Sequence, residues 1–203
     1  ESRKIVPGLV DFIVQNLDIV LETYETIFTH NKKLLNLDDK FKWTPAYGLY
    51  IQEPKIYEKT KMLSMITSNK TMTKNHEFRN HLAEVWRDSL DLYGRGYNEI
   101  ENKEDGLVDY MFSIAIENDC YGTYFTEKIM DCFAVGTIPV YLGAPDIGEH
   151  FNIDGIIIVL DKDFDINNLT KGLYRDKLDI VKENFERVLQ YDVLEDWIYK
   201  RYF

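Results

Sequence analysis

Two different patterns of apolar and polar positions divide the chain. From residue 61 onward, short apolar runs alternate with segments whose apolar residues recur every three or four positions. Runs of the first kind are typical of buried strands, and the second pattern is typical of amphipathic helices. Strands are predicted at 61–68, 90–93, 110–116, 137–142 and 155–160, and helices at 77–90, 126–135, 166–174, 178–189 and 194–202. This alternation predicts an α/β protein with a doubly wound, Rossmann-like parallel sheet, which binds its ligands at the carboxyl ends of the strands.

Two of the predicted helices carry further detail. In the first of them, 77–90, one apolar stripe is expected to face the sheet; it consists of Phe78, Leu82, Val85 and Trp86. In the helix at 126–135, Thr126 is expected to cap the N-terminus and Gly136 to end the helix.

The first sixty residues do not follow this alternation. Helical spacing predicts one helix over 10–24, and a short strand follows at 27–29. Aromatic residues between 41 and 51, together with Pro45 and Gly48, predict a strand and a turn. The polar stretch 52–60, which contains Pro54, is the best candidate for a linker. We therefore divide the chain at this linker, into residues 1–55 and residues 56–203, of which the second part is a Rossmann-like domain.

Charge and composition narrow the possible ligands. The 203 residues include 24 Lys and Arg against 35 Asp and Glu, which gives a net charge of −11. Binding to duplex nucleic acid requires a basic face, so this class of partner is not expected. A phosphate ligand would instead be bound by a few placed cations. Two cysteines make neither a disulfide framework nor a zinc site, and no apolar run is long enough to cross a bilayer.

The segment 110–151 concentrates the chemistry. A buried strand ends at Ile116, and the polar residues Glu117 and Asn118 follow at once. After a loop, Glu127 and Lys128 occupy the first turn of the next helix, where free amides and the helix dipole favour a phosphate. A lysine opposes that dipole unless an anion joins it, and the neighbouring carboxylate could face a ribose. The alternative is that Glu127 and Lys128 are solvated charges, that Asn118 only forms a turn and that Tyr124 is a half-buried aromatic residue of the loop.

Three motifs in this segment resemble a known signature. They are Glu117-Asn118, then Tyr124-Phe125-Thr126-Glu127-Lys128, then Gly136-Thr137-Ile138-Pro139-Val140-Tyr141-Leu142-Gly143-Ala144-Pro145. In order and spacing they resemble the donor-binding signature of the α-1,3/α-1,4-fucosyltransferases, glycosyltransferase family 10. One departure is Ile116, where the family usually has an aromatic residue. A looser similarity includes 65–70, Phe78-Arg79-Asn80 and 92–96.

The resemblance implies the C-terminal half of a GT-B glycosyltransferase that inverts the sugar and uses GDP-fucose without a metal or other cofactor. Residues 1–55 would be the tail of the acceptor domain, and 56–203 the donor-binding domain. The donor-binding residues it implies are Ser68, Asn69, Arg79, Glu117, Asn118, Tyr124, Thr126, Glu127 and Lys128. Among these, Arg79 and Lys128 would bind the diphosphate, Glu127 the ribose hydroxyls, and Tyr124 would line the nucleotide pocket. The alternative for Arg79 is a surface arginine paired with an acid.

The general base implied by the resemblance is a carboxylate of the acceptor domain, and Glu1 is the candidate; the alternative is that a terminal glutamate is inert. The Asp161-Lys162-Asp163 stretch has the form of a metal-binding Asp-x-Asp, but its acidic loop favours a solvated cluster, and no metal is expected. The expected partners are a nucleotide sugar and a glycan acceptor.

Two other functions fit the same residues. The scaffold could use another nucleotide sugar, or it could be a non-catalytic binding module, and the isolated chain is expected to transfer sugar weakly or not at all. The location would be cytoplasmic for a bacterial or viral protein and the Golgi lumen for a eukaryotic one. The sequence predicts neither the acceptor nor the oligomeric state.

Overall fold

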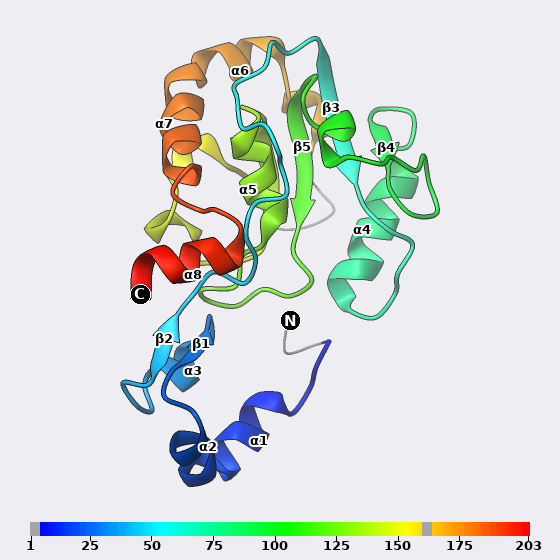
Figure 1. Cartoon of the computed structure of the whole chain (residues 1–203). Coiled ribbons are helices and arrows are strands. Elements are labelled where there is room, and N and C mark those ends of the chain that lie inside the picture. Colours follow the sequence, from blue (N-terminus) through cyan, green and yellow to red (C-terminus); the bar gives the residue numbers. More distant parts are fainter. Residues whose placement is uncertain (1–4, 160–163) are drawn as a thin grey trace.

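The computed structural model describes residues 5–159 and 164–203, and its main body is built on a five-stranded parallel sheet (Figure 1). The strands are β3 (Lys61–Ile66), β4 (Asp91–Tyr93), β5 (Tyr110–Ile116), β6 (Ile138–Leu142) and β7 (Ile157–Ile158), in the order β4-β3-β5-β6-β7. The chain starts in the middle at β3, adds β4 on one side, and returns to add β5 on the other. The winding therefore reverses between β3 and β5, and such a switch point is where doubly wound sheets bind ligands.

Helices cover both faces of this sheet, as a doubly wound fold requires (Figure 1). The helices of the main body are α4 (Lys74–Val85), α5 (Glu127–Ala134), α6 (Lys171–Asp176), α7 (Leu178–Val188) and α8 (Leu194–Tyr202), with short 3₁₀ turns η1 (Lys103–Gly106), η2 (Ile147–Glu149), η3 (Ile153–Gly155) and η4 (Ile166–Asn168). Of these, α8 packs against the N-terminal unit instead of the sheet, with the ring centroids of Trp197 and Trp43 5.4 Å apart. One core lies around α5, and the other around α4 and α6. All seven residues of β5 are buried, as expected for a strand between two covered faces. The predicted α/β, Rossmann-like fold is confirmed.

The N-terminal part is a small unit below the main body (Figure 1). It contains α1 (Leu9–Gln15), α2 (Leu17–Thr23), β1 (Ile27–Thr29), α3 (Lys32–Leu35) and β2 (Phe41–Trp43), and β1 pairs with β2 in parallel. The prediction of a single helix over 10–24 is wrong, because the helix breaks at Asn16. There the side-chain Nδ2 of Asn16 donates to the carbonyl of Phe12 at 2.8 Å, a local bond that competes with helix continuation.

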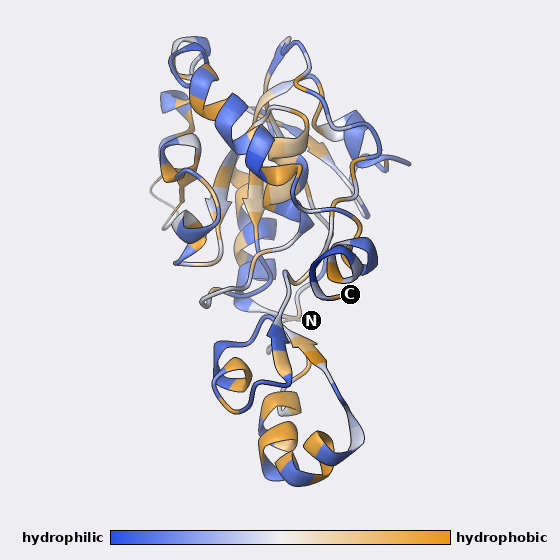
Figure 2. Ribbon diagram, turned by 60° about the vertical axis from the view of Figure 1, so that its left-hand side comes forward, coloured by the Kyte–Doolittle hydropathy of each residue, from blue (hydrophilic) through white to orange (hydrophobic). Residues whose placement is uncertain are grey.

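The apolar residues of α1 and α2 do not form a core. Figure 2 shows much of this unit in orange, yet neither helix has a buried residue. Phe12 and Ile19 are 60% and 64% exposed. Helical spacing therefore indicated helices correctly here but did not indicate burial.

The predicted linker 52–60 contains neither helix nor strand, but it is fastened to the main body. The backbone N–H groups of Lys55 and Tyr57 donate to the carbonyls of Ala134 and Val135, at 2.9 and 3.3 Å. The ammonium of Lys59 donates to Val135 O at 2.7 Å. The segment thereby satisfies carbonyl groups that the C-terminus of α5 leaves free. The division of the chain at residues 55 and 56 stays a prediction.

Two predicted helices differ from the structure in their bounds or their faces. The helix α4 begins at Lys74 rather than 77, because Thr73 Oγ1 accepts a hydrogen bond from the backbone of His76 and caps it. Its buried face includes Arg79 and Leu82, while Val85 is 59% exposed, so the predicted stripe was wrong at Val85. The helix predicted at 166–174 is divided into η4 and α6, since Thr170 caps α6.

Candidate functional site

A cavity of about 190 Å³ lies at the switch point of the sheet. Its walls come from residues 66–68 at the end of β3, residues 113–115 of β5, Arg79 of α4, Lys103 of η1 and the first two turns of α5. Two buried polar atoms at this cavity, Thr67 Oγ1 and Arg79 Nε, have no hydrogen-bond partner among the described residues. Native proteins rarely leave such groups unsatisfied, so these atoms point to a ligand or water in the cavity.

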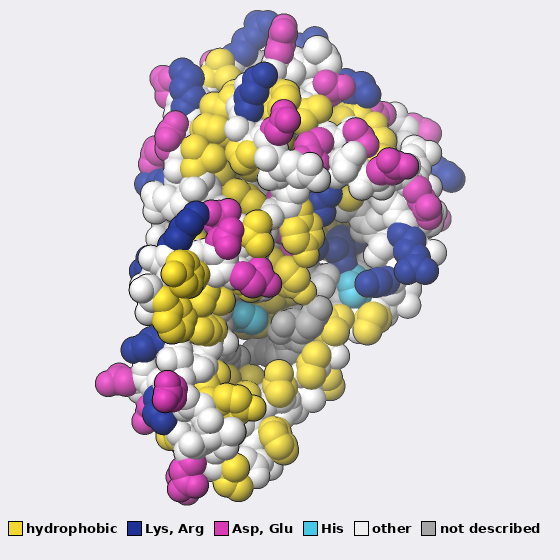
Figure 3. Space-filling model, in the orientation of Figure 1, with side chains coloured by type: hydrophobic (Ala, Val, Ile, Leu, Met, Phe, Trp, Pro, Cys, Tyr) yellow, Lys and Arg dark blue, Asp and Glu magenta, His cyan; other side chains and the backbone are white. Residues whose placement is uncertain are grey.

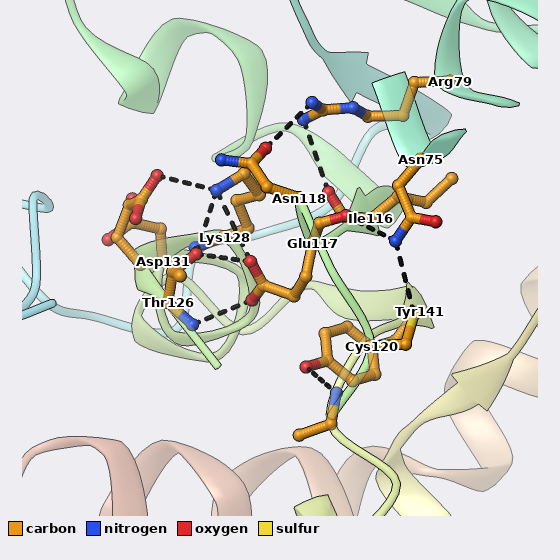
Figure 4. A network of polar contacts seen from close by, with 12 residues as sticks. Asn75, Arg79, Ile116, Glu117, Asn118, Cys120, Thr126, Lys128, Asp131 and Tyr141 are labelled. Atoms are coloured by element: carbon orange, nitrogen blue, oxygen red, sulfur yellow. Dashed lines mark hydrogen bonds and ion pairs between the residues drawn. The ribbon is translucent and has the colours of Figure 1, made fainter. Parts of the chain in front are cut away.

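The N-terminus of α5 is fixed to the end of β5 by Glu117 (Figure 4). This side chain is completely buried, and its Oε1 accepts the backbone N–H of Thr126 at 2.8 Å. The hydroxyl of Thr126 donates to Glu117 Oε2 at 2.7 Å and accepts the backbone N–H of Lys128 at 3.4 Å, as an N-cap does. The predicted cap at Thr126 is confirmed. Glu117 therefore fixes the start of α5 through Thr126, and it does not line the cavity.

Lys128 extends from this first turn between three protein oxygens. Its Nζ lies 3.0 Å from Thr126 Oγ1, 3.3 Å from Glu127 Oε1 and 3.5 Å from Glu117 Oε2. The side chains of Lys128 and Glu127 are only 22% and 12% exposed. The alternative of two solvated charges is therefore wrong.

Four charged side chains alternate in sign along one wall of the cavity: Lys128, Glu127, Lys103 and Asp131. Lys103 Nζ lies 3.3 Å from Glu127 Oε1 and 2.9 Å from Asp131 Oδ2. Burial raises the pKa of Glu127, but the nearby charges of Lys128 and Lys103 outweigh it and lower this pKa to about 2. Burial lowers the pKa of Lys103, and Asp131 and Glu127 reverse this, so that its pKa is raised. Both groups are charged at neutral pH.

Arg79 closes the opposite side of the cavity. Its Nη2 donates to Asn118 Oδ1 at 3.0 Å and its Nη1 to the carbonyl of Ile116 at 3.4 Å (Figure 4). The residue is 5% exposed, so the alternative of a surface arginine is wrong. A buried guanidinium whose Nε lacks a partner is suited to bind an anion.

The structure does not bring all the predicted residues to the cavity. Ser68 lines it, whereas Asn69 is exposed beyond it. Tyr124 is completely buried and stacks on Tyr121 with ring centroids 4.9 Å apart, outside the cavity wall. Its predicted role in lining a nucleotide pocket stays a prediction. Glu1 lies outside the described residues.

Two charged residues of the cavity, Lys103 and Asp131, were not predicted from the sequence. Asp131 had a signal: it follows Glu127 by four positions, so both lie on one face of α5, and a buried carboxylate there implies a cation. Lys103 had none, because it follows Asn102 within an acidic turn and its partners are distant in sequence.

A larger hollow, of about 790 Å³, lies between residues 6–11, residues 31–33 and Tyr121-Gly122. Figure 3 shows a recess at this level, between the N-terminal part and the main body. The two lysines on its wall are paired with acids, Lys32 with Asp146 at 2.6 Å and Lys33 with Asp11 at 3.3 Å. We assign the site to the smaller cavity, because it lies at the switch point and has two buried polar atoms without a partner, Thr67 Oγ1 and Arg79 Nε, on its wall.

Within residues 5–159 and 164–203, no three His, Cys, Asp or Glu side chains gather in a group that could hold a metal ion. In the same part of the chain, no helix is both long and apolar enough to span a bilayer. The Asp161-Lys162-Asp163 stretch lies outside these residues.

The charge of Glu127 makes stability depend on pH. Its pKa in the folded chain, about 2, lies below the ordinary value of 4.5, so its contribution is present above pH 4.5 and is lost as pH falls toward 2. Between about pH 6 and pH 3 we expect the wild-type chain to lose about 2 kcal/mol more unfolding free energy than Glu127→Gln. Urea unfolding at both pH values measures this. Equal losses in the two proteins would contradict the ion pairs described for Glu127.

Comparison with known proteins identifies the family. Residues 56–191 match the family model described as glycosyltransferase family 10 (fucosyltransferase), C-terminal part. An alpha-(1,3)-fucosyltransferase, FucT, of Helicobacter pylori is 41% identical over 71 residues, which are 34% of this chain and 15% of that protein. The chain belongs to glycosyltransferase family 10.

Solved structures agree with this at the level of the fold. A crystal structure of an alpha1,3-fucosyltransferase with GDP has a TM-score of 0.58 at 19% identity, over 84% of this chain and 71% of that one. TarM has a TM-score of 0.51 at 11% identity, over 94% of this chain and 44% of its own. In the Helicobacter pylori relative, the matched part is only 15% of the protein's length.

Proposed function

We propose that this chain is the donor-binding part of an inverting glycosyltransferase that transfers fucose from GDP-fucose to a glycan hydroxyl without a metal. One observation carries the proposal: in a chain of this family, Arg79, Lys128 and the N-terminus of α5 meet at the switch-point cavity. The residues match the charge of a nucleoside diphosphate, although the chain as a whole is acidic.

The cations suit the charge that develops in this reaction. The acceptor oxygen forms a bond to the anomeric carbon while the bond from that carbon to the β-phosphate oxygen breaks. The bonding electrons leave with the diphosphate, and the acceptor proton passes to a base. Arg79, Lys128 and the free amides of α5 would stabilise the negative charge that grows on the diphosphate, which is the role of a metal in other transferases.

Glu127 suits the ribose next to the diphosphate. Because its carboxylate is charged at neutral pH, it only accepts hydrogen bonds, and ribose hydroxyls can donate them. It follows Thr126 at the helix start and neighbours Lys128, so a ribose and a diphosphate of one nucleotide could be bound by consecutive residues. Such charge-assisted hydrogen bonds are among the stronger polar contacts.

The proposed general base, Glu1, lies outside the described residues. Glu1 stays the candidate base, and residues 1–55 stay the candidate tail of the acceptor domain. For the donor, GDP-fucose is the choice that agrees with the family. Another nucleotide sugar is the second candidate, since Arg79, Lys128 and Glu127 face groups that all nucleoside diphosphates share.

Nucleotide binding tests the proposal. In the presence of a chelator, GDP is expected to raise the thermal unfolding temperature more than UDP or ADP at equal concentration, because a ligand of the native state stabilises it according to its affinity. Equal shifts with the three nucleotides would favour the second donor. Binding that is lost on chelation and restored by Mn²⁺ would contradict metal independence, and no shift with any nucleotide would contradict the proposal itself.

A further inference from the structure

We propose that Lys103 is a positioning residue of the donor site, which keeps Glu127 charged and oriented toward the ribose while Lys128 turns to the diphosphate. The inference rests on the proposed function and adds to it a residue that the motifs do not contain. Its starting point is that two lysines from different elements, Lys103 of η1 and Lys128 of α5, both lie 3.3 Å from the same oxygen, Glu127 Oε1.

Lys128 cannot keep all its present contacts and also bind a phosphate. An ammonium group has three donors, and those of Lys128 already face Thr126, Glu127 and Glu117. Thr126 and Glu117 are completely buried, whereas Glu127 lines the cavity. A diphosphate entering from the cavity therefore competes first with Glu127 for Lys128. The long, flexible stem of a lysine allows this exchange.

Lys103, in contrast, is fixed on several sides. Its ammonium lies 2.9 Å from Asp131 Oδ2 and 4.5 Å from the centre of the Tyr50 ring. The Asp131 side chain is itself held, since its Oδ1 accepts the backbone N–H of Tyr50 at 2.9 Å. Lys103 is thus anchored by the segment that leads into the main body, and it can remain beside Glu127 when Lys128 departs.

The surroundings of Glu127 make a second cation necessary. The charged groups around it are Arg79 of α4, Lys103 of η1, Glu117 directly after β5, and Lys128 and Asp131 of α5. Glu117 and Asp131 are carboxylates, and their charges repel the carboxylate of Glu127. When Lys128 pairs with a phosphate, Lys103 is the cation left in ion-pair contact with Glu127. Without it, a mostly buried carboxylate would take up a proton or turn away.

The test compares GDP with 2′,3′-dideoxy-GDP, which lacks the ribose hydroxyls that Glu127 would bind. Affinities of both nucleotides are measured by calorimetry for the wild-type chain, Lys103→Met and Glu127→Gln. The matched control is Lys182→Met, which removes an exposed lysine whose ion pair with Asp179 is on the surface of α7. If Lys103→Met does not fold, Lys103→Met combined with Asp131→Asn removes both charges and leaves no buried carboxylate unpaired there.

The expected result is a change in discrimination. The wild-type chain and Lys182→Met should bind GDP about tenfold more tightly than the dideoxy nucleotide, the size of one charge-assisted contact. In Lys103→Met and Glu127→Gln this ratio should fall below about threefold. The deficit of Lys103→Met for GDP should also grow when the pH is lowered, because Glu127 without Lys103 takes up a proton at a higher pH than in the wild type and then loses the charge that accepts the ribose hydroxyls.

Other outcomes overturn the inference. If Lys103→Met weakens both nucleotides equally, or neither, while Glu127→Gln loses the discrimination, then Lys103 is not a positioning residue and the proposed function stands. If the wild-type chain binds both nucleotides equally, Glu127 does not bind the ribose hydroxyls. The inference then fails, whereas the proposed binding of GDP stands. If the wild-type chain binds no GDP, the proposed function fails and the inference fails with it.

Discussion

Replacement of Arg79 and Lys128 together by methionine is expected to weaken GDP binding by about a thousandfold. Each side chain would contribute a charge-assisted hydrogen bond to the diphosphate, and such bonds contribute about 1.5–3 kcal/mol each. The two residues lie on α4 and α5, at opposite sides of the cavity, so their losses should be close to additive. Titration calorimetry with GDP measures the effect.

A control with the same chemistry separates the site from the general loss of charge. Arg175→Met with Lys182→Met removes one arginine and one lysine from α6 and α7, where both are exposed. This variant should bind GDP as the wild type does. If the Arg79 and Lys128 variant is folded by circular dichroism and still binds GDP at wild-type affinity, the phosphate site lies elsewhere.

Glu117→Ala is expected to lower the unfolding free energy by about 3–5 kcal/mol, the usual cost of removing one partner of a buried ion pair. Its loss leaves the backbone N–H and the hydroxyl of Thr126, which are completely buried, without their acceptor. It also removes one of the carboxylates that pair with Lys128. Glu117→Gln keeps an acceptor for Thr126 and should cost about half as much or less. Urea unfolding at neutral pH measures both.

The matched control is Glu186→Ala on the exposed side of α7, where surface substitutions usually change stability by less than about 0.5 kcal/mol. A Glu117→Ala variant as stable as this control would show that Glu117 does not hold the start of α5. Glu117 would then have to be reconsidered as a residue that faces the ligand.

The central part of the fold could be predicted from the sequence because its signals are local. The strand β5 is a continuous apolar run, and α5 has a capping residue at one end and a glycine at the other. The polar residues that join β5 to α5 follow the strand within twelve residues, from Glu117 to Lys128. A motif so compact is visible in the sequence, and the switch point of the sheet then places it at the cavity.

The rest depends on contacts between distant segments or on single side chains. Lys103 reaches Asp131 across 28 positions, and no periodicity indicates such a pair. The break at Asn16 comes from one side-chain hydrogen bond, which competes with helical spacing that is otherwise regular. In α4, the buried face is shifted from the apolar stripe because it includes Arg79, a polar residue placed there by its bonds to Ile116 and Asn118.

A crystal structure of the chain with GDP tests the central claim most directly. We predict that the diphosphate lies at the N-terminus of α5, within hydrogen-bond distance of Lys128 Nζ and the Arg79 guanidinium, and that the ribose hydroxyls donate to Glu127. Lys103 should keep its contact with Glu127 while Lys128 leaves it. GDP bound in the larger hollow beside Lys33 and Tyr121, with the charges around α5 unchanged, would contradict the account.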